Sequence, residues 1–450
     1  MTRVDLLLAG ARVVHADRVA AADVAVAHGR IVALLPPGTP IAAGHVVDLA
    51  GRLLFPGLVD AHVHLREPGL THKEDIASGT RAAAAGGVTT LLVMPTDEPW
   101  TQAPEHLEQK TALARARAHV DLGFQTTLAR EGTDPSELAG SGAVSIELFT
   151  ADVPALFLHD TLASLIAALA RIGPAGVVAG ISPGDQSVLD AAERLGGASI
   201  EAFGASRPPA AEAMGVARAI TAAAATGARV HIRQVNSALG LATLRAMKPL
   251  ADVSAETTVQ NLLFTAQDYV RLGAAIKASP PFRQPADVEA LRAAVRDGTI
   301  DMVATDHAPH SPAEKAAHYP RFGDIPGGMP GVQTLLPMML HLAATGVLAL
   351  PDIARLCAAN PAARFGLGTR KGQIAEGFDA DMVAVDPARA STIRSGDQLS
   401  KAAATPFDGV RVPYHVESVW LAGRRIAQDG VPLGPALGRV VTPRRDGRPA

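Results

Sequence analysis

Cysteine, aromatic residues and long apolar segments are scarce in this chain, and each shortage excludes a class of protein. Cys357 is the only cysteine among 450 residues, so a disulfide within the chain is excluded and a reducing compartment, the cytoplasm, is predicted. Aromatic residues make up 4% of the chain and hydrophobic residues 48%, so the core must consist mainly of aliphatic side chains. The apolar run at residues 4–10 is too short for a signal peptide or a membrane helix, so no membrane association is expected.

An excess of charge of one sign is also missing. The net charge is −3, and the Lys and Arg residues are scattered without forming a basic stripe. The sequence therefore gives no support for a nucleic-acid partner. The chain is long. Its 450 residues are too many for one ordinary small core, which favours a large barrel with an accessory domain.

The middle of the chain alternates short apolar runs with Ala-rich helical stretches such as 73–85, 210–226, 239–247 and 288–296. This alternation favours an α/β fold of the (β/α)8 or TIM-barrel type. A doubly wound open sheet is the alternative, but it usually carries a Gly-rich phosphate loop after its first strand, and none is visible here. The eight predicted strands are Leu54–Ala61, Val88–Met94, Val120–Thr127, Ala143–Phe149, Gly176–Ile181, Arg229–Val235, Asp252–Thr257 and Asp301–Thr305.

The two ends of the chain have a different pattern, in which short β-like runs are separated by turns. Because chain termini often lie near each other, both ends are expected to share one sheet. We predict a composite β-sandwich domain from residues 1–54 plus 368–450 and a barrel domain from residues 55–367.

Two histidines flank one valine at the end of the first predicted barrel strand. Alternate side chains of a strand share a face, so His62 and His64 point the same way and can bind one metal ion. The alternative is a pair of structural histidines. Since chemistry in a barrel sits at the carboxyl ends of its strands, this position favours the metal site.

Two carboxylates are candidates to complete that site. Asp306 follows the eighth strand, where it could bind a metal and take a proton from water, although a turn or helix-cap role is the alternative. Glu147 lies inside the apolar fourth strand. Because a lone buried carboxylate is costly, Glu147 is either a metal ligand or a paired structural carboxylate.

Other polar residues near strand ends have open roles. Arg66 could hold a substrate carboxylate in a two-pronged contact, or form a salt bridge with Glu67 or Glu74. His231 and Gln234 are three residues apart in the sixth strand, so only one of them can point into the barrel, and His231 is expected to be a packing residue. The last candidates are His307 and His310, which lie near a substrate or on the surface.

The chain resembles the cyclic amidohydrolases of the amidohydrolase superfamily, dihydroorotases most closely and allantoinases nearly as well. The resemblance covers almost the whole chain, and the motifs around His62 and Asp306 are its most specific parts. The matching segments are 56–69 (PGLVDAHVHLREPG), 73–75 (KED), 86–90 (GGVTT), 94–95 (MP), 206–209 (SRPP), 280–283 (PPFR), 305–310 (TDHAPH), 331–334 (GVQT) and 377–381 (GFDAD).

The resemblance implies a zinc site that is only half retained. His62, His64 and Asp306 match the ligands of one zinc ion of the family's two. The family's bridging lysine and its two remaining histidines are replaced by Glu147, Ser182 and Gln234. A hydroxyl and an amide are poor zinc ligands, so about one zinc per chain is expected.

The resemblance also implies the substrate contacts. Arg66 and His310 match the residues that hold the substrate carboxylate, whereas Thr96 and Ser279 replace family asparagines. The predicted substrate is a small acidic cyclic amide or ureide, opened or closed at a ring C–N bond in the manner of pyrimidine metabolism. Two alternatives stay open: an inactive dihydroorotase-like scaffold that partners aspartate transcarbamoylase, or a family member adapted to another ring. A homo-oligomer is expected for the family.

Overall fold

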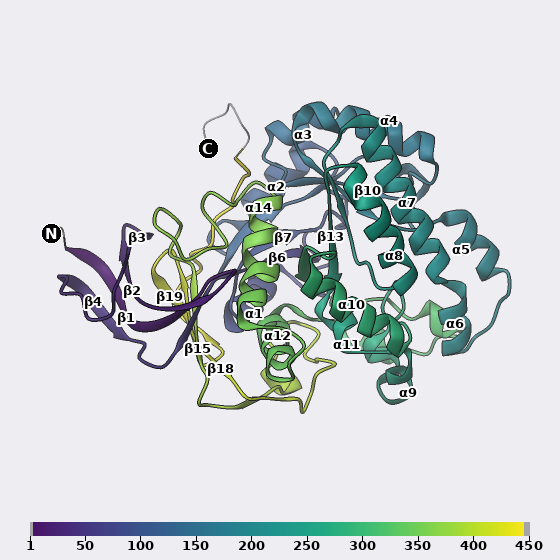
Figure 1. Cartoon of the computed structure of the whole chain (residues 1–450). Helices are drawn as coiled ribbons and strands as arrows, with labels where there is room; N and C mark the ends of the chain where they lie inside the picture. Colours follow the sequence, from purple (N-terminus) through teal and green to yellow (C-terminus); the bar gives the residue numbers. More distant parts are fainter. Residues whose placement is uncertain (1–2, 445–450) are drawn as a thin grey trace.

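The protein is described by a computed structural model that covers residues 3–444. Residues 1–2 and 445–450 of the predicted composite domain lie outside this described part. A sheet region built from both chain ends lies at one side of the molecule and the helix-covered barrel at the other (Figure 1). Within the described residues, no helix has both the length and the apolar character needed to cross a membrane.

The sheet region is a nine-stranded sheet to which both chain ends contribute. Its order is β20-β19-β18-β15-β5-β1-β2-β3, with β4 paired to β1. The two halves meet where β15 pairs antiparallel with β5, so the predicted sharing of one sheet by both ends is confirmed. The strands are β1 (Val4–Val14), β2 (Val19–Ala27), β3 (Arg30–Leu35), β4 (Ala43–Asp48), β5 (Leu53–Pro56), β15 (Met382–Asp386), β18 (His415–Leu421), β19 (Arg424–Gln428) and β20 (Val431–Pro432); a separate pair is β16 (Ser391–Thr392) and β17 (Arg411–Val412).

The barrel is made of eight parallel strand positions, and the predicted (β/α)8 class is confirmed. Consecutive strands pair in parallel from β6 to β8 and from β9 to β14, and a parallel bridge between Val63 and His307 joins the first position to the segment after the last. All eight predicted runs overlap a barrel strand. The strands are β6 (Leu58–Val63), β7 (Val88–Val93), β8 with β9 (Asp121–Phe124, Thr126–Thr127), β10 (Ser145–Phe149), β11 (Val178–Ser182), β12 (Val230–Ile232), β13 (Val253–Thr258) and β14 (Met302–Ala304).

The first predicted run, Leu54–Ala61, is wrong in its bounds because it contains parts of two strands. β5 belongs to the nine-stranded sheet and β6 to the barrel, and Gly57 separates them. The Gly57 N–H donates to the Asp381 carbonyl at 2.8 Å, and a Cβ at Gly57 would lie 2.2 Å from Thr89 Oγ1. The chain therefore passes from one sheet to the other at a residue where no side chain fits.

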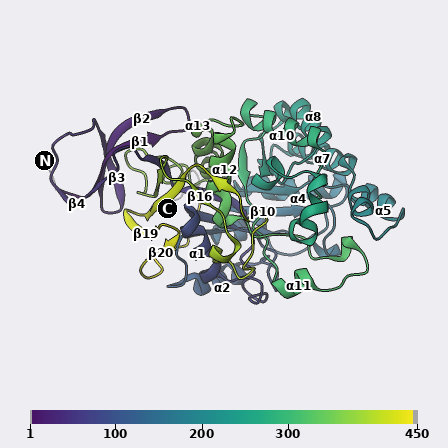
Figure 2. The same ribbon diagram turned by 90° about the horizontal axis from the view of Figure 1, so that it is seen from below.

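Helices cover the outside of the barrel, as both views show (Figure 2). The four predicted helical segments correspond to α1, α7, α8 and α10. Asp75 caps α1, because its side chain accepts from Ser78 N. The helices are α1 (Ile76–Gly86), α2 (Pro104–Ala114), α3 (Pro135–Gly140), α4 (Leu162–Ile172), α5 (Gln186–Glu193), α6 (Ile200–Ser206), α7 (Pro209–Thr226), α8 (Ala238–Met247), α9 (Tyr269–Leu272), α10 (Pro285–Asp297), α11 (Pro312–Ala316), α12 (Leu335–Ala344), α13 (Leu350–Ala354) and α14 (Asn360–Arg364).

The barrel interior changes from apolar to polar along the strands. Near the strand starts, buried aliphatic side chains pack with Phe365, including Val59, Val144, Val178 and Met302. Further along the strands, the fully buried residues become charged: Glu147, His231, Arg233 and Glu256. Because a buried charge is costly unless it is paired, each charged side chain in this polar layer is expected to have a partner.

Candidate active site

His62, His64 and Asp306 converge at the carboxyl ends of the first and eighth barrel strands. Asp306 Oδ1 lies 3.3 Å from His62 Nε2 and 3.2 Å from His64 Nε2. Their possible ligand atoms all lie within 4.8 Å of one another. The backbone of His64 is tied to the eighth strand's loop, since its N–H donates to the His307 carbonyl at 2.7 Å. The structure thus brings together the three residues predicted to form one metal site.

The Nδ1 atom of each imidazole has a hydrogen-bond partner, and each Nε2 atom faces Asp306. His62 Nδ1 lies 2.6 Å from Glu256 Oε1, and His64 Nδ1 lies 2.8 Å from Thr96 Oγ1. A carboxylate can only accept, so His62 carries a proton on Nδ1 and, when neutral, a lone pair on Nε2. Thr96, predicted to contact substrate, instead holds His64.

The electrostatics of this cluster suit a cation. Burial works against a charged His62, yet Asp306 and Glu256 outweigh it and raise the pKa of this histidine. Burial lowers the pKa of His64 to about 4, so His64 is neutral and can donate a lone pair. Two imidazole nitrogens and a carboxylate oxygen, with a carboxylate behind one imidazole, are a donor set that fits zinc.

A second acidic cluster, at the opposite end of the barrel, has its own cation. Asp121, Asp379 and Asp381 also bring their oxygens within 4.8 Å of one another. Lys371 Nζ lies among them, at 2.6, 3.1 and 2.5 Å respectively. This cluster is therefore a set of ion pairs between the barrel and the residues around β15.

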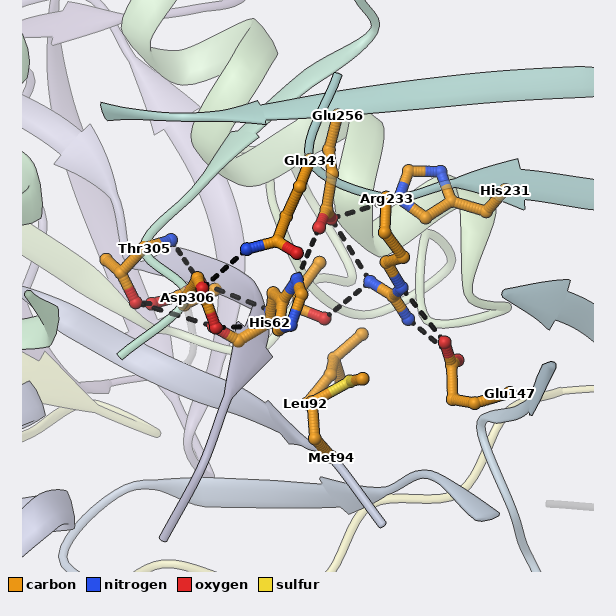
Figure 3. A network of polar contacts seen from close by, with 12 residues as sticks. His62, Leu92, Met94, Glu147, His231, Arg233, Gln234, Glu256, Thr305 and Asp306 are labelled. Atoms are coloured by element: carbon orange, nitrogen blue, oxygen red, sulfur yellow. Dashed lines mark hydrogen bonds and ion pairs between the residues drawn. The ribbon is translucent and has the colours of Figure 1, made fainter. Parts of the chain in front are cut away.

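Glu147 pairs with Arg233 and lies outside the His62–His64–Asp306 cluster. Arg233 Nη2 donates to Glu147 Oε1 at 2.8 Å and Nε donates to Oε2 at 3.1 Å (Figure 3). Ser145 Oγ also donates to Oε1, at 2.6 Å. Of the two roles left open for Glu147, the structure shows the paired carboxylate, because a guanidinium rather than a metal compensates its charge.

Gly180 makes room for this pair. It lies beside Glu147 in the register of β10 and β11, and a Cβ there would meet the Glu147 carboxylate oxygens at 2.1 and 2.2 Å. The carboxylate is held by Arg233 and cannot move aside without breaking a buried ion pair.

We expect Gly180→Ala to lower the free energy of unfolding by about 2 kcal/mol, a typical cost of overpacking a core. Equilibrium unfolding in urea measures this free energy for the wild type and the variant. The matched control is Gly204→Ala in α6, where an added Cβ meets nothing within 4 Å. An alanine should be neutral or slightly stabilising there. Equal effects of both changes would contradict this account of Gly180.

Arg233 also reaches Glu256, which no sequence argument had identified. Arg233 Nη1 donates to Glu256 Oε2 at 3.1 Å and to the Ala61 carbonyl at 2.9 Å. His231 Nε2 lies 3.0 Å from the same Glu256 oxygen. A chain of contacts therefore runs from Glu147 through Arg233 and Glu256 to His62. The available signal was that Arg233 and Glu256, like Glu147, are charged residues within the predicted barrel strands.

Gln234 contacts Asp306, so the expectation that only one of His231 and Gln234 could point inward is wrong. Gln234 Nε2 donates to Asp306 Oδ2, while His231 faces Glu256 inside the barrel. Strand β12 ends at Ile232, and Gln234 has φ of 48°, so the alternation of a regular strand no longer applies. Asp306 and Arg66 also have left-handed backbones, with φ of 45° and 59°. Such conformations are uncommon for residues other than glycine.

A cavity of about 270 Å³ opens beside this cluster. Gln234 borders it on the side of Asp306, and Ser182 and Ser279, two positions singled out in the sequence, line it as well. The remaining wall comes from segments after the fourth, fifth and seventh strands and from α7. The lining includes Asp152, Pro183, Gly184, Arg207, Glu212, Pro280 and Arg283.

Arg66 is a cation beside the cluster that forms no salt bridge within the described part of the chain, although Asp306 attracts it electrostatically. The two acids proposed as alternatives are occupied: Glu67 binds Arg117 at 2.7 Å, and Glu74 accepts from Ser78 and Ser400. Arg66 Nε is buried and has no hydrogen-bond partner among residues 3–444. Burial lowers the pKa of Arg66, which remains a cation because a guanidinium does not lose its proton in proteins.

His310 is a neutral hydrogen-bond acceptor. Its Nε2 lies 2.9 Å from the Gly327 carbonyl, which can only accept, so Nε2 carries the proton. Burial, together with Arg66, lowers the pKa of His310 to about 4. Its Nδ1 is therefore an acceptor, and this buried atom has no hydrogen-bond partner in the described part of the chain, with Glu314 Oε2 3.7 Å away. His307 Nδ1 accepts from the backbone N–H of Gly331, at 3.1 Å.

Two family models match the sequence. The model described as "Amidohydrolase family" matches residues 186–426, and the model described as "Dihydro-orotase-like" matches residues 51–153. The chain is 38% identical to a dihydroorotase of Halobacterium salinarum over 380 residues, which is 83% of this chain and 86% of that protein. It is 36% identical to an allantoinase of Rubrobacter xylanophilus over 458 residues, 99% of each.

Solved structures show the same fold. The chain superposes on an L-hydantoinase (dihydropyrimidinase) from Arthrobacter aurescens with a TM-score of 0.92 and 26% identity, covering 98% of this chain and all of that one. A dihydropyrimidinase from Brevibacillus agri gives a TM-score of 0.90 at 26% identity, with 98% and 99% covered. The similarity therefore extends over both the barrel and the nine-stranded sheet.

Proposed function

Because this chain belongs to the amidohydrolase family, we propose that it is a dihydroorotase-like hydrolase that opens a cyclic amide at a ring C–N bond with about one zinc ion per chain. The observation that carries the proposal is the convergence of His62 Nε2, His64 Nε2 and Asp306 Oδ1 beside a cavity of about 270 Å³. Three protein ligands leave a position for water, as in catalytic zinc sites.

Each residue of the cluster has a separate task. A zinc ion held by His62, His64 and Asp306 would supply Lewis acidity, which would activate water and polarise a ring carbonyl. Asp306 takes the proton of the attacking water and returns it to the leaving ring nitrogen. Gln234, which donates to Asp306 Oδ2, fixes the orientation of that carboxylate. Glu256 and Thr96 keep the two imidazoles turned toward the site.

The charges around the cavity favour an acidic substrate. Arg66 forms no salt bridge with any described carboxylate, and its buried Nε is free to bind one of the substrate's carboxylate oxygens. Two lysines lie nearby, Lys277 buried and Lys315 half-buried. Burial and a neighbouring cation lower the pKa of Lys277 to about 8 and that of Lys315 to about 7. A bound anion would stabilise all three cations.

Neutral His310 suits a ring N–H rather than a carboxylate. Its free Nδ1 can only accept in this protonation state, whereas the ring nitrogens of cyclic amides and ureides are donors. We therefore assign the substrate carboxylate to Arg66 and a ring N–H to His310. Ser279, at the wall of the cavity, is available to the far side of the ring.

A scaffold that binds aspartate transcarbamoylase is the second candidate function. The observation that favours it is the loss of three metal-ligand types at Glu147, Ser182 and Gln234. The intact and well-oriented cluster of His62, His64 and Asp306 favours the hydrolase instead, because a buried set of this kind needs a cation.

Metal analysis coupled to assays decides between them. We expect protein purified from zinc-supplemented cells to contain about one zinc per chain, and to open dihydroorotate in proportion to its zinc content, with allantoin and hydantoins as comparison substrates. His62→Ala should lose both zinc and turnover. Near-zero metal would overturn the hydrolase, and co-purification with a transcarbamoylase without ring opening at any zinc level would establish the scaffold.

A further inference from the structure

Arg233 is the largest charged side chain that is fully buried in the barrel, and every polar atom of its guanidinium is used. Its nitrogens donate to Glu147, to Glu256, to the Ala61 carbonyl and to Gln125 Oε1. It is 0% exposed, as are both carboxylates. A guanidinium is a permanent cation with a rigid fork of donors, so this arrangement is fixed in charge and in geometry.

Every oxygen of the two carboxylates has a hydrogen-bond partner. Glu147 Oε1 accepts from Arg233 and Ser145, and Glu147 Oε2 accepts from Arg233. Glu256 Oε1 is bound to His62, and Glu256 Oε2 to Arg233 and His231. The charge of both carboxylates is therefore compensated by the Arg233 guanidinium rather than by a metal ion. Ser182 and Gln234, at the neighbouring strand ends, offer only neutral donors and acceptors.

We propose that Arg233 is a positioning residue that acts as the fixed internal cation of the active site. It holds Glu256 where that carboxylate orients His62, and it occupies with Glu147 the interior that a second metal ion would need. This inference rests on the proposed function, because it takes the His62–His64–Asp306 cluster to be a metal site. It goes further because it assigns one of the positive charges at this end of the barrel to the Arg233 side chain. The site then binds a single metal ion.

The route from Arg233 to the metal site is short. Arg233 Nη1 and His62 Nδ1 bind different oxygens of the same Glu256 carboxylate, at 3.1 and 2.6 Å (Figure 3). Removing the guanidinium frees one side of Glu256, which can then rotate toward His231 and release His62. Residues that orient a metal-binding histidine in this way affect metal affinity about 10- to 100-fold.

Chelator-stripped protein titrated with Zn²⁺ against a chromophoric chelator tests the proposal. We expect the wild type to bind one tight equivalent. Arg233→Met combined with Glu147→Gln avoids leaving a buried charge on Glu147, and this double variant should bind its single equivalent at least about tenfold more weakly. Glu147→Gln alone keeps the Arg233–Glu256 contact, so it is the matched control and should bind within about threefold of the wild type.

Two further readouts separate positioning from folding. The visible spectrum of the Co²⁺-loaded protein reports the ligand geometry, and it should change in the double variant but not in Glu147→Gln. Thermal unfolding without metal shows whether each variant folds. If the double variant does not fold, Arg233→Lys replaces it. The lysine keeps the positive charge but lacks the planar set of guanidinium donors. Its Zn²⁺ affinity should lie between that of the wild type and the roughly tenfold weaker affinity expected without Arg233.

The outcomes are distinct for the two proposals. Equal Zn²⁺ affinity and equal Co²⁺ spectra in the control and the folded Arg233 variant would overturn the role of Arg233. Two tight equivalents in the wild type would overturn it as well, while leaving a metal-dependent hydrolase in place. A wild type that binds no Zn²⁺ tightly would overturn the proposed function itself.

Discussion

Asp306→Asn is expected to lower kcat for ring opening by about a thousandfold, within the range measured for loss of a general acid–base group. The amide has the same shape, so Gln234 can still contact it and the histidines can still face it. What it lacks is the ability to take a proton from the attacking water. Steady-state kinetics at known zinc content measure the effect and separate lost proton transfer from lost metal.

The control makes the same chemical change at a distance. Asp121 is a buried carboxylate at the opposite end of the barrel, where it binds Lys371. Asp121→Asn should reduce stability and leave kcat near that of the wild type. If Asp306→Asn retained its zinc and stayed within tenfold of the wild-type kcat, Asp306 would be a ligand only, and another group would have to move the proton.

Arg66→Met is expected to lower kcat/KM for an acidic ring by about 100-fold, since hydrogen bonds to charged groups contribute about 1.5 to 3 kcal/mol. Among the described residues the guanidinium forms no ion pair with a carboxylate, so its loss breaks no salt bridge of the protein. For an uncharged ring such as hydantoin, the same change should have little effect. The ratio of the two kcat/KM values is therefore the measurement.

Arg66→Lys is the graded comparison. It keeps the charge but cannot make a two-pronged contact, so the preference for the acidic ring should fall to an intermediate value. A loss of equal size for acidic and uncharged rings in Arg66→Met would mean that Arg66 supports the loop rather than the substrate.

Much of the barrel could be predicted because its strands are buried on both faces and are largely apolar. β7 and β10 are of this kind, although Thr89 and Thr90 interrupt the first and Ser145 and Glu147 the second. The boundary at Gly57 could not be predicted from the same property, because residues 53–59 are one apolar stretch and the break depends on distant residues. Asp381 accepts the Gly57 N–H, and Thr89 fills the space beside it.

The metal cluster was predictable for a geometric reason. His62 lies near the end of β6, His64 and Asp306 come just after β6 and β14, and the carboxyl ends of barrel strands meet at one face. The partners behind them were not. Glu147 and Arg233 lie 86 residues apart, and their contact depends on which strands face each other across the interior. The contact of Thr96 with His64 could not be predicted either, because it depends on a loop whose shape the sequence does not reveal.

The break at Gly57 has a mechanical consequence. One stretch of chain supplies a strand to each sheet, and the strand that carries His62 starts directly after the glycine. With the Gly57 N–H bound to Asp381 and no room beside Thr89, this joint cannot act as a hinge. The nine-stranded sheet is therefore rigidly connected to the strand that carries the ligands. A distortion of this sheet is transmitted along β6 to the two histidines.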